Sequence, residues 1–183
     1  MIRKAERGDL AACAALIRKS FMTVAEQLGL TEDNAPRFTA FSVTPERLER
    51  QMDEGRPMFV CEEDGVLCGY CSLLLGQDGE CELNNLAVLP EFRHRGIGGR
   101  LLARAVSAAE DAGCTVMNIG IVEENRTLRQ WYERCGAVHC GTAKFDFFPF
   151  TCGYMKIGLR GAAAKTGPGE DSARDMGDRG GEA

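Results

Sequence analysis

The feature that most constrains this chain is the run Leu86 to Leu102, LAVLPEFRHRGIGGRLL, in which an apolar strand end leads through a basic, glycine-rich turn into an amphipathic helix. Arg93, Gly96 and Gly98 give the turn an Arg-x-x-Gly-x-Gly pattern. Glycines at these positions let successive backbone N–H groups point inward, and the helix dipole adds positive potential behind them. The run therefore predicts a site for an anion, and phosphate is the expected occupant.

Two common phosphate-binding patterns do not fit this turn. A Walker A loop needs a lysine followed by a hydroxyl residue, which the turn lacks, so nucleotide hydrolysis of that type is not expected. A dinucleotide fingerprint begun at Gly96 needs a third glycine at position 101, where Leu101 stands instead. Both nucleotide-binding interpretations are set aside on spacing alone.

The turn resembles the acetyl-coenzyme A motif of the GCN5-related N-acetyltransferase (GNAT) superfamily, which follows a strand ending in a Leu-Ala-Val-like triplet. The segment from Asn125 through Tyr132 to Gly136 is similar to a later element of that family, and Ile2–Leu10 resembles its first strand and helix entry. The resemblance spans residues 1–160. It implies the following acetyl-CoA-binding set: Leu86, Ala87, Val88, Arg93, His94, Arg95, Gly96, Ile97, Gly98, Gly99, Arg100, Asn125 and Tyr132.

The resemblance also implies a fold of the α/β (α+β) class, with a mixed central sheet of about six to seven strands flanked by helices. In this fold a splayed strand pair and a β-bulge lie at the acetyl-CoA site. Alternation in the strand 81–88 breaks across Asn84-Asn85, because Leu83 and Leu86 lie an odd number of residues apart, and a bulge explains the break. We expect a GNAT domain over 1–160 and a disordered tail, rich in glycine and charge, over 161–183.

Local patterns place the elements along the chain. Asp9 and the Thr44-Pro45 pair are helix starts, and Asp64-Gly65 is a favoured hairpin turn. Gly113 and Gly136 are helix ends. The expected strands are 2–7, 58–62, 66–75, 81–88 and 115–122, with a final pair around 141–148 and 154–159, and the expected helices follow Asp9, Thr44, Gly96 and Asn125.

The resemblance implies acetyl transfer to a primary amine in one ternary complex, without a covalent enzyme intermediate. An alkylamine with a pKa near ~10.4 is almost wholly protonated at pH 7, so a group must accept its proton. Glu82 is the candidate base, and a solvated strand carboxylate is its alternative. Tyr132 is the candidate proton donor to the leaving thiolate, and a core aromatic is its alternative. Asn125 is expected to contact the pantetheine arm, to cap the following helix, or both.

Composition narrows the partners. The formal net charge of -5 argues against nonspecific nucleic-acid binding, and no stretch approaches the ~20 apolar residues of a membrane span. With no signal-peptide pattern at the start, we expect a cytoplasmic protein. The nine cysteines are scattered, and only two histidines occur, so no metal site is expected. Cys68 and Cys71 lie in an expected strand, where residues three apart face opposite sides, so we interpret them as core residues.

A noncatalytic acyl-CoA binding or sensing module is the competing function, since it needs the glycine turn without Glu82 or Tyr132. The acceptor, a small molecule or a peptide, is not specified by the sequence. The segments Phe21–Gln51 and Phe145–Phe150 are expected to roof its pocket, although clustered phenylalanines more often fill a core or a dimer contact. The sequence therefore leaves a homodimer open.

Overall fold

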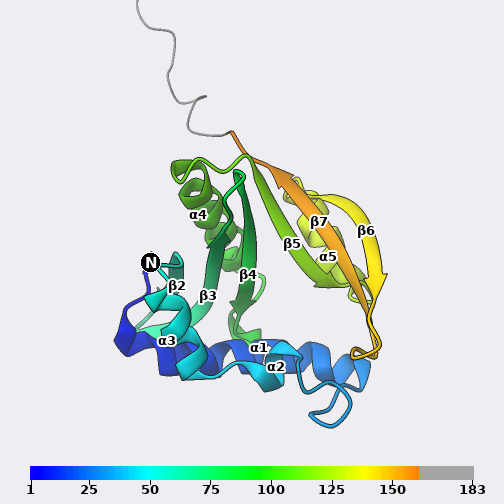
Figure 1. Cartoon of the computed structure of the whole chain (residues 1–183). Coiled ribbons are helices and arrows are strands. Elements are labelled where there is room, and N and C mark those ends of the chain that lie inside the picture. Colours follow the sequence, from blue (N-terminus) through cyan, green and yellow to red (C-terminus); the bar gives the residue numbers. More distant parts are fainter. Residues whose placement is uncertain (161–183) are drawn as a thin grey trace, which may run out of the picture.

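A mixed seven-stranded sheet organises the computed structural model, which describes residues 1–160. Its strand order is β1-β2-β3-β4-β5-β7-β6, and β4 and β5 run parallel (Figure 1). The strands are β1 (Ile2–Lys4), β2 (Met58–Glu63), β3 (Val66–Leu75), β4 (Glu80–Val88), β5 (Val116–Val122), β6 (Val138–Lys144) and β7 (Thr151–Gly158). The expected mixed sheet flanked by helices is confirmed, and the tail expected over 161–183 lies outside the described residues.

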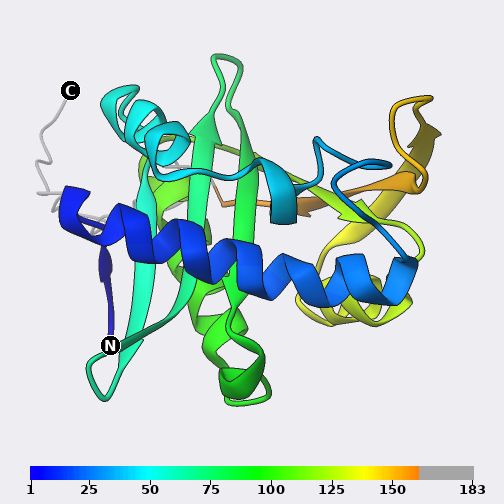
Figure 2. The same cartoon turned by 90° about the horizontal axis from the view of Figure 1, so that it is seen from below.

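Helices cover both faces of this sheet. On one face lie α1 (Leu10–Leu28), α2 (Thr39–Ser42) and α3 (Pro45–Asp53). On the other lie α4 (Ile97–Asp111) and α5 (Arg126–Arg134), and short 3₁₀ turns occur at η1 (Arg7–Asp9) and η2 (Pro90–Phe92). Figure 2 shows α1 crossing in front of the strands, with α4 and α5 behind them.

Each layer contact buries its own apolar cluster. The largest cluster lies between the sheet and α4 and α5, and includes Leu73, Leu83, Leu101 and Met117. A second joins α1 and α3 to β2 and β3, and a third gathers phenylalanines near the C-terminal half of α1. In β2 neighbouring side chains enter different clusters, since Phe59 and Cys61 lie in the first and Val60 in the second, as expected where helices cover both faces of a strand.

Several predicted element boundaries are confirmed by the backbone. The Thr44 hydroxyl accepts a hydrogen bond from the N–H of Arg47 at 3.2 Å, which caps α3. Asp64 and Gly65 adopt φ of 51° and 76°, as a tight hairpin turn between β2 and β3 requires. Gly113 follows α4 with φ of 84°, where a side chain would be strained.

Other boundaries differ from those expected. The first strand ends at Lys4 rather than at position 7, because η1 begins at Arg7. The final strands are β6 and β7, over 138–144 and 151–158, instead of 141–148 and 154–159. The reason is that Phe145–Phe150 forms the loop between them, and its rings stack on one another, with Phe148 and Phe150 centroids 4.6 Å apart.

The expected orientation of Cys68 and Cys71 is wrong. The β2–β3 register shifts between Cys61 and Glu62, and this irregularity brings both thiols into the same core cluster. Both are free and fully buried, as small apolar core residues are. Over residues 1–160 no group of three or more His, Cys, Asp or Glu side chains is arranged to hold a metal ion.

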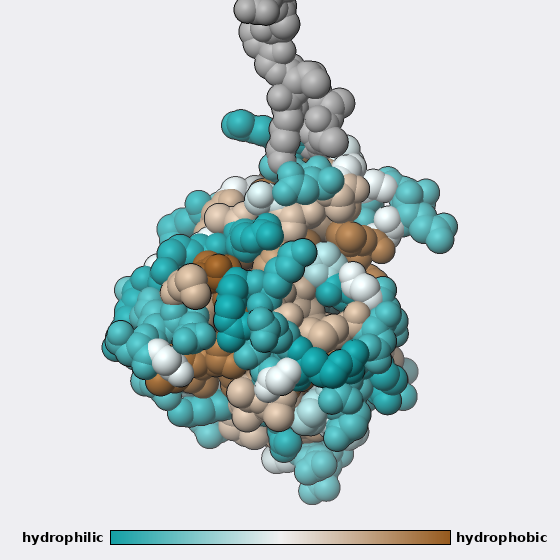
Figure 3. Space-filling view, turned by 90° about the vertical axis from the view of Figure 1, so that its left-hand side faces the viewer, coloured by the Kyte–Doolittle hydropathy of each residue, from teal (hydrophilic) through white to brown (hydrophobic). Residues whose placement is uncertain are grey.

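The outer surface on the side of the N-terminal strands is largely hydrophilic, with apolar residues visible between charged ones (Figure 3). Within the described part of the chain, none of the helices combines the length and apolar character that crossing a bilayer requires.

Candidate functional site

The turn between β4 and α4 has the backbone of an anion site. His94 and Gly96 both adopt left-handed φ, at 63° and 75°, and α4 begins at Ile97 directly after them. The turn carries no side-chain cap, and Arg100 N–H is the first to bond back, to the carbonyl of Gly96 at 3.1 Å. The earlier N–H groups of the helix therefore face outward at its positive end, as a bound anion requires.

The two glycines after Ile97 differ in their surroundings. A Cβ on Gly98 would lie 3.3 Å from Trp131 Cζ2, so Gly98 lets α5 approach α4 closely. A Cβ on Gly99 would meet nothing within 4 Å, so Gly99 leaves open space at the exposed helix start. The first glycine serves packing and the second keeps the turn accessible.

Arg93 points toward α1 and away from solvent. Its guanidinium donates to the carbonyls of Val88 at 3.2 Å and Ser20 at 3.0 Å, and to the hydroxyls of Ser20 at 3.2 Å and Thr23 at 3.1 Å. Burial lowers the pKa of this guanidinium, although it stays charged. The side chain thus clamps the turn to α1, and its direct contact with a cofactor stays a prediction.

The other two arginines of the turn lie at the surface. Arg95 donates to the Glu91 carbonyl at 3.2 Å and lies over the Phe92 ring at 5.0 Å. Arg100 forms an ion pair with Glu63 at 2.6 Å, and that hydrogen bond raises the pKa of the guanidinium. Of these two surface arginines, Arg95 is therefore the one without a carboxylate partner among the described residues.

The register of β4 shifts opposite β3 in the stretch where alternation breaks. Tyr70 and Ser72, two residues apart, face Ala87 and Asn84, which are three apart, and Asn85 has a φ of 52°. Leu89 N–H donates to the Cys68 carbonyl at 2.9 Å, so Gly69 and Val88 form a non-hydrogen-bonded pair. The N–H of Val88 consequently points away from β3, beyond the stretch Glu80–Leu83 over which β4 pairs with β5.

Glu82 stands exposed on β4, on the sheet face opposite α4, with Asn118 of β5 directly across from it. Among the described residues it has no hydrogen-bond or ion-pair partner. Its neighbour Glu80 does, since Glu80 accepts from Asn118 at 2.8 Å and lies 3.8 Å from Lys156. Glu82 is thus the carboxylate of this strand that is available to an incoming ligand.

Tyr132 lies on α5 in the largest core cluster and is 5% exposed. Its ring packs edge-on against Trp131, with centroids 4.9 Å apart, and burial raises the pKa of its hydroxyl well above the usual range. The hydroxyl therefore keeps its proton at neutral pH. Asn125 caps the same helix, because its side-chain oxygen accepts from the N–H of Leu128 at 3.1 Å, which is one of its two predicted roles.

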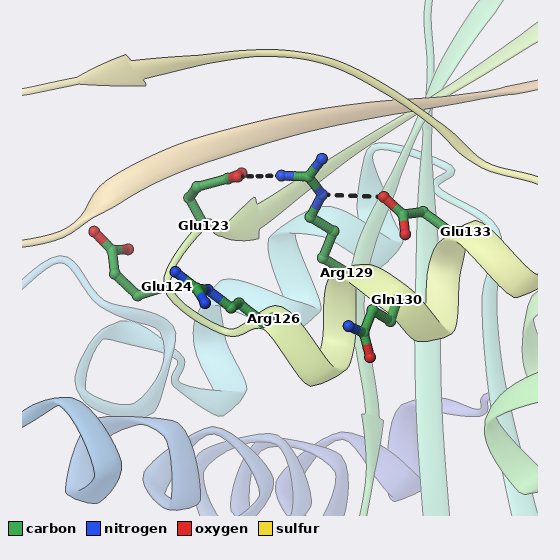
Figure 4. A pocket seen from close by; sticks show the side chains of 6 residues that line it. All are labelled: Glu123, Glu124, Arg126, Arg129, Gln130 and Glu133. Carbon is green, nitrogen blue, oxygen red and sulfur yellow. Dashed lines mark hydrogen bonds and ion pairs between the residues drawn. The ribbon is translucent and has the colours of Figure 1, made fainter.

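A hollow of about 520 Å³ lies around the start of α5 (Figure 4), lined by Glu123, Glu124, Arg126, Arg129, Gln130 and Glu133. Glu123 accepts from Arg129 at 2.6 Å and lies 2.9 Å from His139 Nε2. Burial opposes ionisation of Glu123, but the hydrogen bonds from His139 and Arg129 hold its pKa below the ordinary value.

The sequence did not predict this cluster of Glu123, Arg129 and His139. The cluster shares no residue with the anion-binding turn at 93–98. The available signal was Gly153, whose added Cβ would lie 2.2 Å from Glu123 Oε2. A glycine in the middle of β7 marks the place where the carboxylate lies against the strand.

The uncapped start of α4, on a mixed sheet flanked by helices, defines an anion-binding α/β protein whose site fits a phosphate group. The family model "Acetyltransferase (GNAT) family" matches residues 28–137, more than half of the chain, so the chain belongs to this family of N-acetyltransferases.

Three similar proteins place the chain within the family. The L-amino acid N-acyltransferase MnaT of Escherichia coli is 30% identical over 142 residues, covering 75% of this chain and 78% of that protein. An uncharacterized N-acetyltransferase of Mycobacterium tuberculosis is 28% identical over 93 residues, and the match spans 51% of this chain and only 60% of that relative. The PaiA N-acetyltransferase of Thermoplasma acidophilum, solved with coenzyme A, superposes with a TM-score of 0.76 at 19% identity, over 87% of this chain and 98% of that one.

Proposed function

We propose that this chain transfers the acetyl group of acetyl-CoA to a primary amine, which attacks the thioester directly in a ternary complex. The observation that carries the proposal is the uncapped start of α4 behind two left-handed residues, His94 and Gly96. It fits the diphosphate of a coenzyme A derivative, and a structural neighbour is a coenzyme A complex.

The backbone supports one path for the cosubstrate. N–H groups from His94 to Gly99 hold the diphosphate, and main-chain groups of Leu86, Ala87 and Val88 hold the pantetheine arm. The outward N–H of Val88 donates to the thioester oxygen as it gains negative charge. Arg93 supports this path from behind by holding the turn against α1.

Glu82 accepts the proton of the incoming ammonium, directly or through water. The neutral nitrogen then attacks the thioester carbon, a C–N bond forms, and the C–S bond breaks. The absence of a protein partner for Glu82 among the described residues favours this role, because a committed carboxylate would be a poorer acceptor.

Tyr132 donates its proton to the departing thiolate and regains one from solvent. Burial keeps this hydroxyl protonated at neutral pH, so its O–H is available to the developing thiolate. Its position on the helix that Asn125 caps keeps the ring oriented.

The competing function is a noncatalytic acyl-CoA binding module. Coenzyme A release from acetyl-CoA with a panel of amines separates the two. Transfer predicts amine-dependent release that falls in Tyr132→Phe and Glu82→Gln, while acetyl-CoA affinity by calorimetry stays within about twofold of wild type. Tight binding without amine-dependent release supports the module, and loss of binding refutes both.

A relative named for L-amino acid N-acylation supports a small amine as the acceptor class. Peptide N-termini stay in the panel, because the sheet face beside Glu82 is exposed at Leu74 and Tyr154. Cytoplasmic localisation and a homodimer stay predictions.

A further inference from the structure

The exposed sheet face beside Glu82 contains a tyrosine with a bare surface on both sides. Tyr154 of β7 is 42% exposed and lies directly between Gly120 of β5 and Gly141 of β6 in the strand register. A Cβ at either glycine would meet nothing within 4 Å. The ring of Tyr154 therefore borders open sheet surface at the two glycines, which a ligand can occupy.

Polarity changes along this face on either side of Tyr154. One step along the strands lies a polar row of Glu82, Asn118 and Lys156, in which Lys156 and Asn118 contact Glu80 and leave Glu82 unmatched. One step in the other direction, Cys152 and Val122 pack against the phenylalanine cluster of the α1–α2 segment and the β6–β7 loop.

That cluster joins the two segments expected to roof the acceptor. Phe38 packs edge-on against Phe150 at 5.7 Å and against Phe21 at 6.0 Å. These rings, of which Phe38 and Phe150 are buried, form a phenylalanine wall that closes one end of the face with apolar side chains, while the Glu82 carboxylate stands at the other end.

We propose that the acceptor is a primary amine that carries an aromatic or branched apolar group a few carbon atoms from its nitrogen. This inference rests on the proposed function and deepens it. The ammonium lies by Glu82, the carbon chain crosses the bare surface at Gly120, and the apolar group contacts the ring of Tyr154. Glu82 on β4 and Tyr154 on β7 are separated by β5, so their strands lie two strand spacings, about 10 Å, apart. The side chains of Glu82 and Tyr154 reach into this span and shorten it to the length of such an amine.

Tyr154 is then a specificity-determining residue, because its ring makes a favourable contact with an apolar group, which a polar amine lacks. A stacked or edge-on aromatic contact corresponds to about a fivefold preference. Gly120 also contributes to specificity because it has no side chain. Any side chain at this position would occupy the space that the acceptor's carbon chain crosses.

The experiment compares four amines, 2-phenylethylamine and isopentylamine against ethanolamine and 1,4-diaminobutane, with acetyl-CoA. Wild type should show kcat/KM at least about fivefold higher for the first pair. Tyr154→Ala and Gly120→Val should bring the ratio toward one with acetyl-CoA affinity unchanged. Valine suits a strand, and its Cβ at position 120 would meet nothing within 4 Å, so Gly120→Val should fold. Val138→Ala, at a 66% exposed residue of β6 on the same face, is the matched control and should keep the ratio.

A second readout needs no turnover. The chain has three tyrosines, and Tyr70 and Tyr132 are 0% and 5% exposed, so fluorotyrosine labelling gives one exposed ¹⁹F signal, assigned by Tyr154→Phe. The two apolar amines should shift it at about fivefold lower concentration than the polar pair.

Equal shifts for all four amines, or turnover without selectivity, overturn the inference while the transferase proposal stands. If the ¹⁹F signal of Tyr154 shifts selectively with the apolar amines but no coenzyme A is released, the transferase proposal is refuted and the amine-binding site is supported.

Discussion

Replacing Arg93 tests whether the phosphate turn is held by α1. Its guanidinium donates four hydrogen bonds, to Val88, Ser20 and Thr23, and hydrogen bonds from a charged group contribute about 1.5–3 kcal/mol each when isolated. The four share one cation, and the Ser20 hydroxyl still reaches the Val88 carbonyl at 3.1 Å without it. We therefore expect Arg93→Met to lower the free energy of unfolding by about 3 kcal/mol rather than by the sum.

For a domain of this size that loss corresponds to a Tm about 6–12 °C lower. Differential scanning fluorimetry, checked by urea unfolding, measures it. Arg95→Met is the matched control, since Arg95 is exposed and should change stability by under about 0.5 kcal/mol. Arg93→Lys should recover only part of the loss, because one ammonium cannot reach all four acceptors. An unchanged Tm in Arg93→Met together with weaker acetyl-CoA binding would refute the clamp and assign the side chain to the ligand.

The remaining predictions concern single groups. Tyr132→Phe should lower kcat about 100-fold with little change in acetyl-CoA affinity, measured by steady-state kinetics and calorimetry. Glu82→Gln should lower kcat/KM with acetyl-CoA affinity kept, and an unchanged kcat/KM would exclude Glu82 as base. Gly153→Ala should destabilise by about 2 kcal/mol, since its Cβ would lie 2.2 Å from Glu123 Oε2, and Glu123→Ala should restore part of it in a double-mutant cycle. The hydrogen bond from the Arg3 guanidinium keeps the pKa of Asp9 below its ordinary value. The contribution of ionised Asp9 to folding stability is therefore present above about pH 4 and is lost as the pH falls through the lower pKa of the folded state. Asp9→Asn should therefore reduce stability in urea at pH 7 more than at pH 2.

The parts of the fold that sequence predicted well are those set by local chemistry. Thr44 with Pro45, and Asp64 with Gly65, fix the backbone through their own side chains or their freedom at positive φ, and the structure has a helix start and a hairpin turn there. Gly96, with its positive φ, is local in the same sense, whereas Gly98 depends on the approach of Trp131 from α5.

What sequence could not give depends on contacts between distant segments. The sequence around Arg93 does not predict that its partners are Ser20 and Thr23, some seventy residues earlier on α1. The shared side of Cys68 and Cys71 arises from a register shift against β2, which alternation within β3 alone does not reveal. The Glu123 network likewise appears only once β5, α5 and β6 meet.

The length of α1 has a consequence for how this chain can diversify. Its 19 residues make a rod of about 28 Å that touches the turn through Ser20 and Thr23, while its last turns, at Ala25 and Leu28, support the phenylalanine wall. Of the α1 residues that support the wall, Ala25 and Leu28 lie beyond those that anchor the turn, whereas Phe21 lies between them. A lineage can therefore exchange one amine for another at the distal end while the donor half of the enzyme is inherited unchanged.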